Sequence, residues 1–407
     1  MGVAFLREAR WLGPERVRVY LWVFAIVNMA TLIILLATSH AGVDRNGFLL
    51  GTDFLSFWTA GRMLHTGANV YDAVAHIAAQ QTFYRQESSY TAFFYPPPFL
   101  PICYPLGFLS YFPALVAWLT VTGAVFLAVA RLWLRKVGID RPLLLLAAAF
   151  PPVLITVTHG QTSFLVAALL GLGALSVRER PTVAGICFGL ATIKPQFGIL
   201  VPFVLLATGE WRVIAAAVAS AVVFALLTTF AFGAEVWPHW LAVGRAAEAA
   251  MDQGAVGFGK MQSAFAAARL LGAPIDIAYG LQALVTLGVV GSVAWAGWRT
   301  GYTFALASAM LAGSLLVTPF VLDYDTILLA FPLVWLAGSG FRPWEKITAL
   351  LAFVAPAVAR PLALQADLPI MPLVLIALFI VLVRRAVAER EDSSRSDSML
   401  GKASAAA

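Results

Sequence analysis

The sequence has little charge and almost no cysteine. Asp, Glu, Lys and Arg together make up 12% of its 407 residues, hydrophobic residues make up 61%, and the mean hydropathy is +0.85. Soluble domains carry about twice this share of charge, so the composition predicts an integral membrane protein. The two cysteines, Cys103 and Cys187, lie in apolar surroundings without metal or redox spacing, and we expect both to be small packing residues.

A cleaved signal peptide is not expected, although basic residues precede the first apolar run. That run covers residues 19–38. The apolar core of a signal peptide has about 7 to 15 residues, whereas about 20 residues cross a bilayer. We therefore expect residues 19–38 to remain as the first membrane span.

The apolar segments predict an all-α polytopic membrane protein with about twelve spans. No internal repeat or soluble domain is evident, so residues 1–384 are expected to form a single transmembrane domain. Residues 385–407 are rich in Ser, Ala and charge, and we expect a disordered tail there because this composition cannot bury a core. The expected spans are residues 19–38, 113–133, 142–158, 162–177, 182–193, 198–208, 213–232, 276–297, 302–319, 325–339, 345–359 and 369–384.

The positions of the basic residues predict the orientation. With both termini cytoplasmic, 19 of the 27 Lys and Arg residues fall on the inside and 8 on the outside, as the positive-inside rule requires. We expect a multi-pass protein of the cell (inner) membrane. Two long loops, residues 39–112 and 233–275, then face the extracytoplasmic side, and helix-like stretches at 53–65 and 71–86 are expected to lie on the membrane surface.

Residues 51–62, in the first outer loop, contain one acid among aromatic residues. We expect Asp53 to lie at the edge of the bilayer, where its carboxylate could act as a general base that removes a hydroxyl proton from a lipid-borne substrate. It could equally cap a short interfacial helix, since Asp is a favoured capping residue. The sequence alone leaves both interpretations open.

Other polar residues fall at the outer ends of expected spans, where ionisable groups usually line a cavity or pair with each other. Individually they could close a turn, anchor a helix end or cap a span. Their convergence on one face favours a functional site. They are His159, Gln161, Lys194, Gln196, Asp323, Tyr324 and Asp325.

Several short motifs, in order along the chain, resemble the polyprenyl-phosphate-mannose-dependent mannosyltransferases of the GT-C superfamily, specifically glycosyltransferase family 87. The motifs are Thr52–Phe54 with Ala60–Arg62, Phe94–Pro98, His159–Gln161, Lys194–Gln196, Gln262–Ser263 and Thr318–Asp325.

The resemblance implies a GT-C-type bundle and an inverting sugar transfer at the outer face, with Asp53 as catalytic base. It also implies substrate-binding roles for Arg62, Tyr95 and Gln262 and for the polar residues at the span ends. One departure concerns a histidine that such relatives often carry before the tenth span. This chain has none there, and Tyr324 or Asp325 is expected to replace it.

The chemistry agrees with a single acidic base. A lipid phosphate is a good leaving group, so one carboxylate could suffice, unlike the paired carboxylates of glycoside hydrolysis. Arg62 and Lys194 could offset charge on the departing phosphate. The first outer loop has no Asp-x-Asp triplet, and although residues 323–325 form one, we expect neither a metal nor another cofactor.

The sequence therefore predicts a membrane glycosyltransferase that moves a hexose, expected to be mannose, from a polyprenyl-phosphate donor to an envelope glycolipid or glycan. Its other partners would be membrane lipids, and no nucleic acid is expected. A transporter or flippase of lipid-linked saccharides is the main alternative, although transporters usually show repeats and helices broken near the midplane. A scaffold would leave the outer polar residues unexplained.

Overall fold

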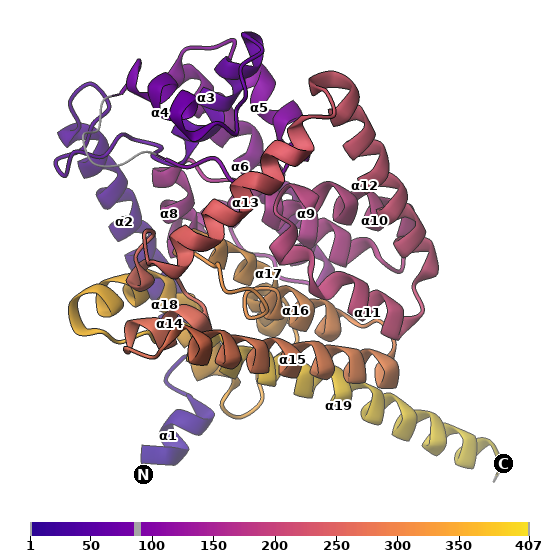
Figure 1. The fold of residues 1–407 in the computed structure, drawn as a ribbon. Helices are drawn as coiled ribbons and strands as arrows, with labels where there is room; N and C mark the ends of the chain where they lie inside the picture. Colours follow the sequence, from indigo (N-terminus) through magenta and orange to yellow (C-terminus); the bar gives the residue numbers. More distant parts are fainter. Residues whose placement is uncertain (1, 85–90, 406–407) are drawn as a thin grey trace.

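The computed structural model describes residues 2–84 and 91–405, and this part of the chain is helical or irregular, without a β-strand. Figure 1 shows both termini at one end of the molecule and α3 to α5 at the other. The α-helices are α1 (Gly2–Glu8), α2 (Pro14–Thr38), α3 (Phe54–His65), α4 (Ala73–Gln81), α5 (Leu100–Leu106), α6 (Tyr111–Lys136), α7 (Leu143–Ala149), α8 (Pro151–His159), α9 (Ser163–Ser176), α10 (Pro181–Leu190), α11 (Leu200–Thr208), α12 (Trp211–Phe232), α13 (Val236–Asp252), α14 (Ala264–Leu270), α15 (Ile275–Thr300), α16 (Phe304–Gly313), α17 (Ala330–Gly338), α18 (Glu345–Ala366) and α19 (Met371–Ala405). The 3₁₀ helices are η1 (Pro97–Phe99), η2 (Ala191–Ile193), η3 (Pro195–Gly198), η4 (Phe258–Lys260) and η5 (Asp323–Leu329).

Six helices of the described chain are long and apolar enough to cross a membrane: α2, α6, α12, α15, α18 and the first part of α19. Each coincides with one of the expected spans. Their outward surfaces are strongly apolar, and Phe230 on α12 is 93% exposed. Water would penalise so large an apolar surface, whereas lipid does not, and the prediction of a helical multi-pass membrane protein is confirmed.

The expected number of about twelve spans is not confirmed, because the other six segments form shorter or broken helices. Proline causes two of the breaks. Phe150 is extended before Pro151, and Lys194 has φ −141° and ψ 72° before Pro195. A residue that precedes proline is driven out of the α-helical region, so the expected span 142–158 divides at Phe150, while the break at Lys194 falls between the expected spans 182–193 and 198–208. A third break covers residues 314–322, between α16 and η5.

The first loop expected on the outer side, residues 39–112, contains the two expected helices, shortened to α3 and α4. Residues 85–86 of the second expected stretch lie outside the described residues. α3 packs on α5 through backbone contact: a Cβ atom at Gly61 would lie 2.2 Å from the carbonyl oxygen of Cys103. Pro96 is extended, and the hydroxyl of Tyr71 donates to the carbonyl oxygen of Tyr95 at 3.0 Å. These contacts fix the position of Tyr95.

The second outer loop contains α13, which runs obliquely across the bundle in Figure 1. The indole of Trp240 on this helix donates to the carbonyl oxygen of Phe94 at 3.2 Å, so the two outer loops touch. Further along, an isolated bridge joins Met261 to Leu322. This pairing holds the second outer loop against the start of η5.

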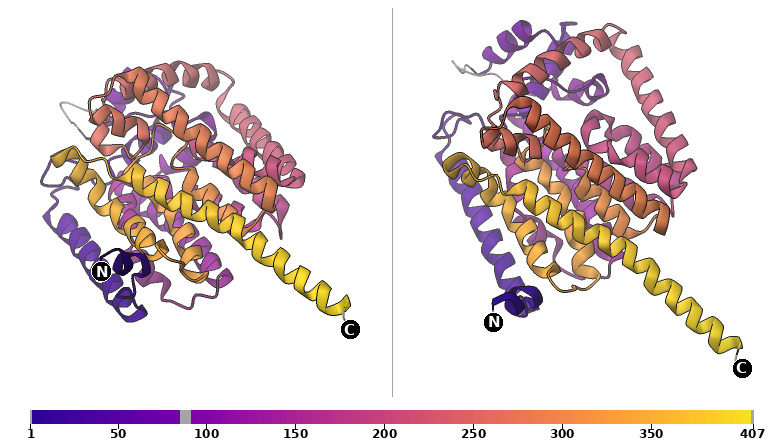
Figure 2. Two further views of the ribbon diagram at one scale, coloured as in Figure 1. Left: turned by 90° about the horizontal axis from the view of Figure 1, so that it is seen from below. Right: turned by 60° about the horizontal axis from the view of Figure 1, so that its bottom comes forward.

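The disordered tail expected at residues 385–407 stays a prediction. α19 continues to Ala405 and projects from the bundle in Figure 2, and Arg385 is buried in an ion pair with Glu345 at 2.6 Å. A membrane helix is already nucleated, so extending it by further residues costs little. Residues 406–407 lie outside the described part.

Candidate functional site

Asp53 occupies the N-cap position of α3, but its side chain makes no capping hydrogen bond. Its carboxylate instead accepts from Nε2 of Gln161 at 2.8 Å. Asp72, by contrast, caps α4 by accepting from the amides of Val74 and Ala75. The side chain of Asp53 therefore does not cap α3, and the capping interpretation does not account for it.

The backbone around Asp53 is tied to the end of α8. The amide of Asp53 donates to the carbonyl oxygen of His159 at 3.0 Å, and the amide of Gly51 donates to that of Thr158 at 3.0 Å. Gly160 follows with φ +64°, and a Cβ atom there would lie 2.6 Å from Cβ of Phe54. A glycine is needed for both the left-handed turn and the close approach. The half-buried carboxylate is thus held in place by two separate segments.

Gln161 is itself held by Tyr95. The Tyr95 hydroxyl donates to Oε1 of Gln161 at 2.7 Å, and the amide of Thr162 donates to the same atom at 2.6 Å. Burial raises the pKa of Tyr95 well above its usual value, and the charges of Asp325 and Asp53 raise it further. The phenol therefore stays neutral and keeps its donor proton, which fixes Gln161 with its amide toward Asp53.

A buried ion pair forms the second half of the site. Nζ of Lys194 lies 2.6 Å from Oδ1 of Asp325, with side-chain exposures of 6% and 2%. The carboxylate also accepts from Oγ of Ser163 at 3.0 Å and from the amide of Leu322 at 3.1 Å. The ammonium lies 5.1 Å from the centroid of the Tyr324 ring. A buried charge requires such partners.

The two halves adjoin. The tripeptide Gln161–Ser163 reaches Asp53 at one end and Asp325 at the other. On the opposite side, the rings of His159 and Tyr324 have centroids 5.7 Å apart. The structure thus brings together seven of the predicted site residues as one group, called the site cluster below: Asp53, Tyr95, His159, Gln161, Lys194, Tyr324 and Asp325.

Asp323 points to a residue that the sequence analysis missed. Its carboxylate accepts from the guanidinium of Arg360 on α18 at 3.2 Å, and Arg360 retains 30% side-chain exposure. The sequence does show that Arg360 directly follows the expected span 345–359, and this position could have marked it as a candidate. Gln262 lies nearby, since its backbone N–H donates to the carbonyl oxygen of Val321 at 2.8 Å.

Like Gln262, two further predicted residues are not joined to the site cluster by a hydrogen bond or ion pair within the described chain. Arg62 is exposed and its guanidinium lies 5.6 Å from the centroid of the Trp58 ring. It stands nine residues after Asp53, about 13 Å along α3. Gln196 is half-buried in η3, two residues after Lys194. Substrate contacts for both remain predictions.

A comparison with known protein families identifies the family of the chain. The model of glycosyltransferase family 87 matches residues 93–322, which is more than half of the chain. The chain belongs to glycosyltransferase family 87. The resemblance drawn from its motifs is confirmed, and the protein is a membrane glycosyltransferase.

The matched segment of this family 87 protein contains Tyr95, Gln161 and Lys194 but ends before Asp323, and Asp53 precedes it. The role of Asp53 therefore depends on the geometry described above. No curated protein and no solved structure matches the chain.

Proposed function

We propose that this family 87 glycosyltransferase moves a hexose, expected to be mannose, from a polyprenyl-phosphate donor to an envelope glycolipid or glycan. The transfer inverts the anomeric carbon and takes place at the extracytoplasmic face of the inner membrane. Asp53 is the general base. The observation that carries the proposal is the half-buried Asp53 carboxylate, which is held by Gln161 and does not cap its helix.

The proposed step needs one base. Asp53 accepts the proton of an acceptor hydroxyl while the hydroxyl oxygen attacks the anomeric carbon. The bond between that carbon and the phosphate oxygen breaks, and its electron pair leaves with the polyprenyl phosphate. Oδ2 of Asp53 already accepts a hydrogen bond from Nε2 of Gln161. Because a carboxylate has two oxygens and further lone pairs, Oδ1 can receive the proton.

Two cations support binding of the donor phosphate. Lys194 uses one of its three donors on Asp325, which leaves two for other partners. Arg360 makes a single contact with Asp323 and is partly exposed, so its planar guanidinium can also engage an oxyanion. Charge on the departing phosphate would be offset by preorganised donors of this kind.

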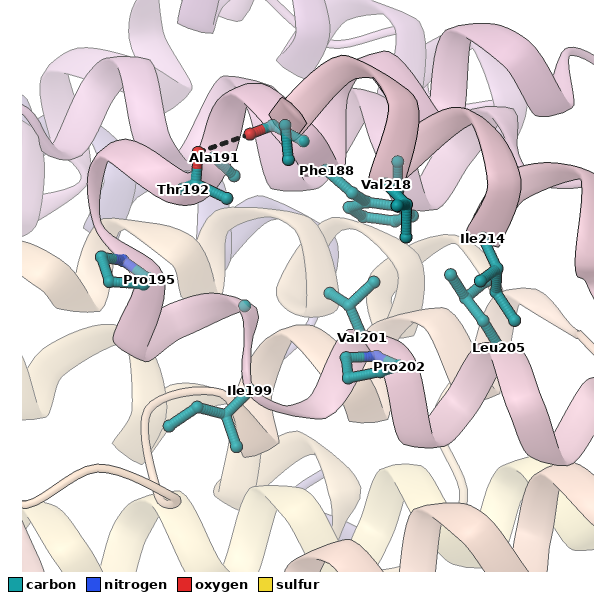
Figure 3. A pocket seen from close by; sticks show the side chains of 14 residues that line it. Phe188, Ala191, Thr192, Pro195, Ile199, Val201, Pro202, Leu205, Ile214 and Val218 are labelled. Atoms are coloured by element: carbon teal, nitrogen blue, oxygen red, sulfur yellow. Dashed lines mark hydrogen bonds between the residues drawn. The ribbon is translucent and has the colours of Figure 1, made fainter. Parts of the chain in front are cut away.

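An apolar groove beside Lys194 suits the hydrocarbon chain of the donor. It has a cavity volume of about 300 Å³ and lies between α10, α11 and α12, with Thr192 and Pro195 on its wall (Figure 3). The hydroxyl of Thr192 already donates to the carbonyl oxygen of Gly189 at 2.6 Å, so this polar group of the wall does not need a hydrogen bond from a ligand. A chain in this groove would end next to the cation at the break after η2.

Filling the groove is expected to weaken donor use. Ala217→Trp places an indole among the lining residues on α12 and should raise the donor concentration for half-maximal transfer by about tenfold, since even part of a buried chain contributes substantially at about 0.8 kcal/mol for each CH₂. Ala219→Trp, at an exposed position of the same helix outside the lining, is the matched control. An equal effect of both variants would remove the groove from the donor path.

A lipid-saccharide transporter is supported by one observation: helix breaks at Lys194 and at residues 314–322, which are frequent in transporters. Such a protein would move the donor intact. Bond cleavage therefore separates the two functions.

A further inference from the structure

A second cavity, of about 450 Å³, lies among α2, α6, α7, α8, α17 and α18. One end of it is remote from the site cluster. On α6, the hydroxyl of Tyr111 bonds to the carbonyl oxygen of Gly51, whereas the cavity reaches Leu134. These two residues are separated by about 35 Å at 1.5 Å per residue. The Leu134 end of the cavity thus lies away from Asp53, whereas its other end is lined by Val153 on α8, about 9 Å along that helix from His159.

Three cations from separate segments line this cavity: Arg18 on α2, Arg141 before α7 and Lys346 on α18. Within the described chain none of them has an ion-pair partner. Glu345, next to Lys346, is already paired with Arg385. Among the described residues, no acidic side chain lines the cavity, so its positive charge is uncompensated.

Apart from these cations the walls are aliphatic and aromatic. On α6 they extend from Phe126 to Leu134, about 12 Å along the helix axis. A sugar or nucleotide would leave its hydroxyl groups without partners against such walls, at a cost for each group. A ligand with one compact anion and a long apolar body satisfies both parts. Basic pockets between membrane helices are known to hold anionic lipid head groups.

We propose that this cavity binds one anionic phospholipid of the leaflet in which the chain termini lie. Its phosphate lies among Arg18, Arg141 and Lys346, and an acyl chain follows α6 toward Phe126. The site is separate from the proposed donor groove, which lies between other helices. It ties α2 and α18 to the core of the bundle.

The test uses the full-length protein in mixed micelles of phosphatidylglycerol and phosphatidylcholine, followed by mass spectrometry of the phospholipid that co-purifies. We expect about one phosphatidylglycerol per chain. The triple variant Arg18→Gln, Arg141→Gln, Lys346→Gln should bind it on the order of 100-fold more weakly, because each cation near an anionic lipid contributes a factor of about five. The matched control, Arg10→Gln, Arg16→Gln, Arg135→Gln, removes equal charge outside the cavity and should retain the lipid.

A second variant keeps the proposal testable if the triple variant does not fold. Ala130→Trp keeps every charge and fills part of the wall, and it should also reduce retention of phosphatidylglycerol. Retention in both cavity variants at the control level would overturn the proposal. Full displacement of the lipid by inorganic phosphate would also overturn it, because the site would then bind a free anion. Formation of a disulfide between two chains through Ala337→Cys would overturn it as well, because the cavity would then be a contact between copies.

Discussion

Asp53→Asn is expected to lower sugar transfer by about 10²–10⁴-fold, the usual contribution of a general base, while donor binding and stability stay close to those of the parent. Asn has the size of Asp and can still bond to Gln161, but it cannot take a proton. Single-turnover transfer in detergent, with donor binding measured separately, gives both quantities.

Asp72→Asn is the matched control for that variant. Asp72 lies in the same outer loop and caps α4 through its side chain, a role that Asn fills equally well. Transfer by this control should remain within a few-fold of the parent. If Asp53→Asn behaves like Asp72→Asn, Asp53 is not the base, and Asp323 or Asp325 would have to take its place.

Lys194→Ala is expected to destabilise the fold by about 3–5 kcal/mol, because it leaves the carboxylate of Asp325 buried without its cation. This loss would hide any effect on the donor. The double variant Lys194→Met, Asp325→Asn removes both charges. The carbonyl oxygen of the introduced asparagine can still accept from the backbone amide of Leu322, and its NH₂ group can donate to Oγ of Ser163. We expect the double variant to recover most of the stability and to require a higher concentration of donor.

Thermal unfolding in detergent and the dependence of transfer rate on donor concentration measure the two effects. Lys194→Arg, which keeps the charge, should fall between the parent and the double variant in both. An unchanged donor requirement in a stable double variant would leave Lys194 as a structural partner of Asp325. An unchanged stability of Lys194→Ala would contradict the buried ion pair itself.

The sequence singled out the residues that the structure groups in the site cluster, but it did not predict how they are paired. Asp53, Gln161, Lys194 and Asp325 were selected because polar groups at span ends are costly in a membrane. That rule names residues one at a time. The pairing of Lys194 with Asp325 depends on two helix breaks, at Pro195 and at residues 314–322, whose relative placement follows from the packing of the whole bundle.

Other features could not be read from local patterns. Arg360 was counted as an ordinary basic residue on the outer side, and its pairing with Asp323 joins positions that are 37 residues apart. The expected number of spans is not confirmed, and one reason is that the apolar run at residues 142–158 was taken as one helix although it contains Phe150–Pro151. Proline was the available sign, and hydropathy alone does not register it.

The fate of the donor tests the central claim most directly. Purified protein in nanodiscs is given polyprenyl-phosphate mannose and a membrane lipid extract, and mass spectrometry follows both lipids while nuclear magnetic resonance reports the anomeric configuration of the product. The account predicts free polyprenyl phosphate together with a lipid or glycan that has gained one hexose of opposite anomeric configuration, and neither product with Asp53→Asn. Recovery of intact donor that has only changed leaflet would contradict it.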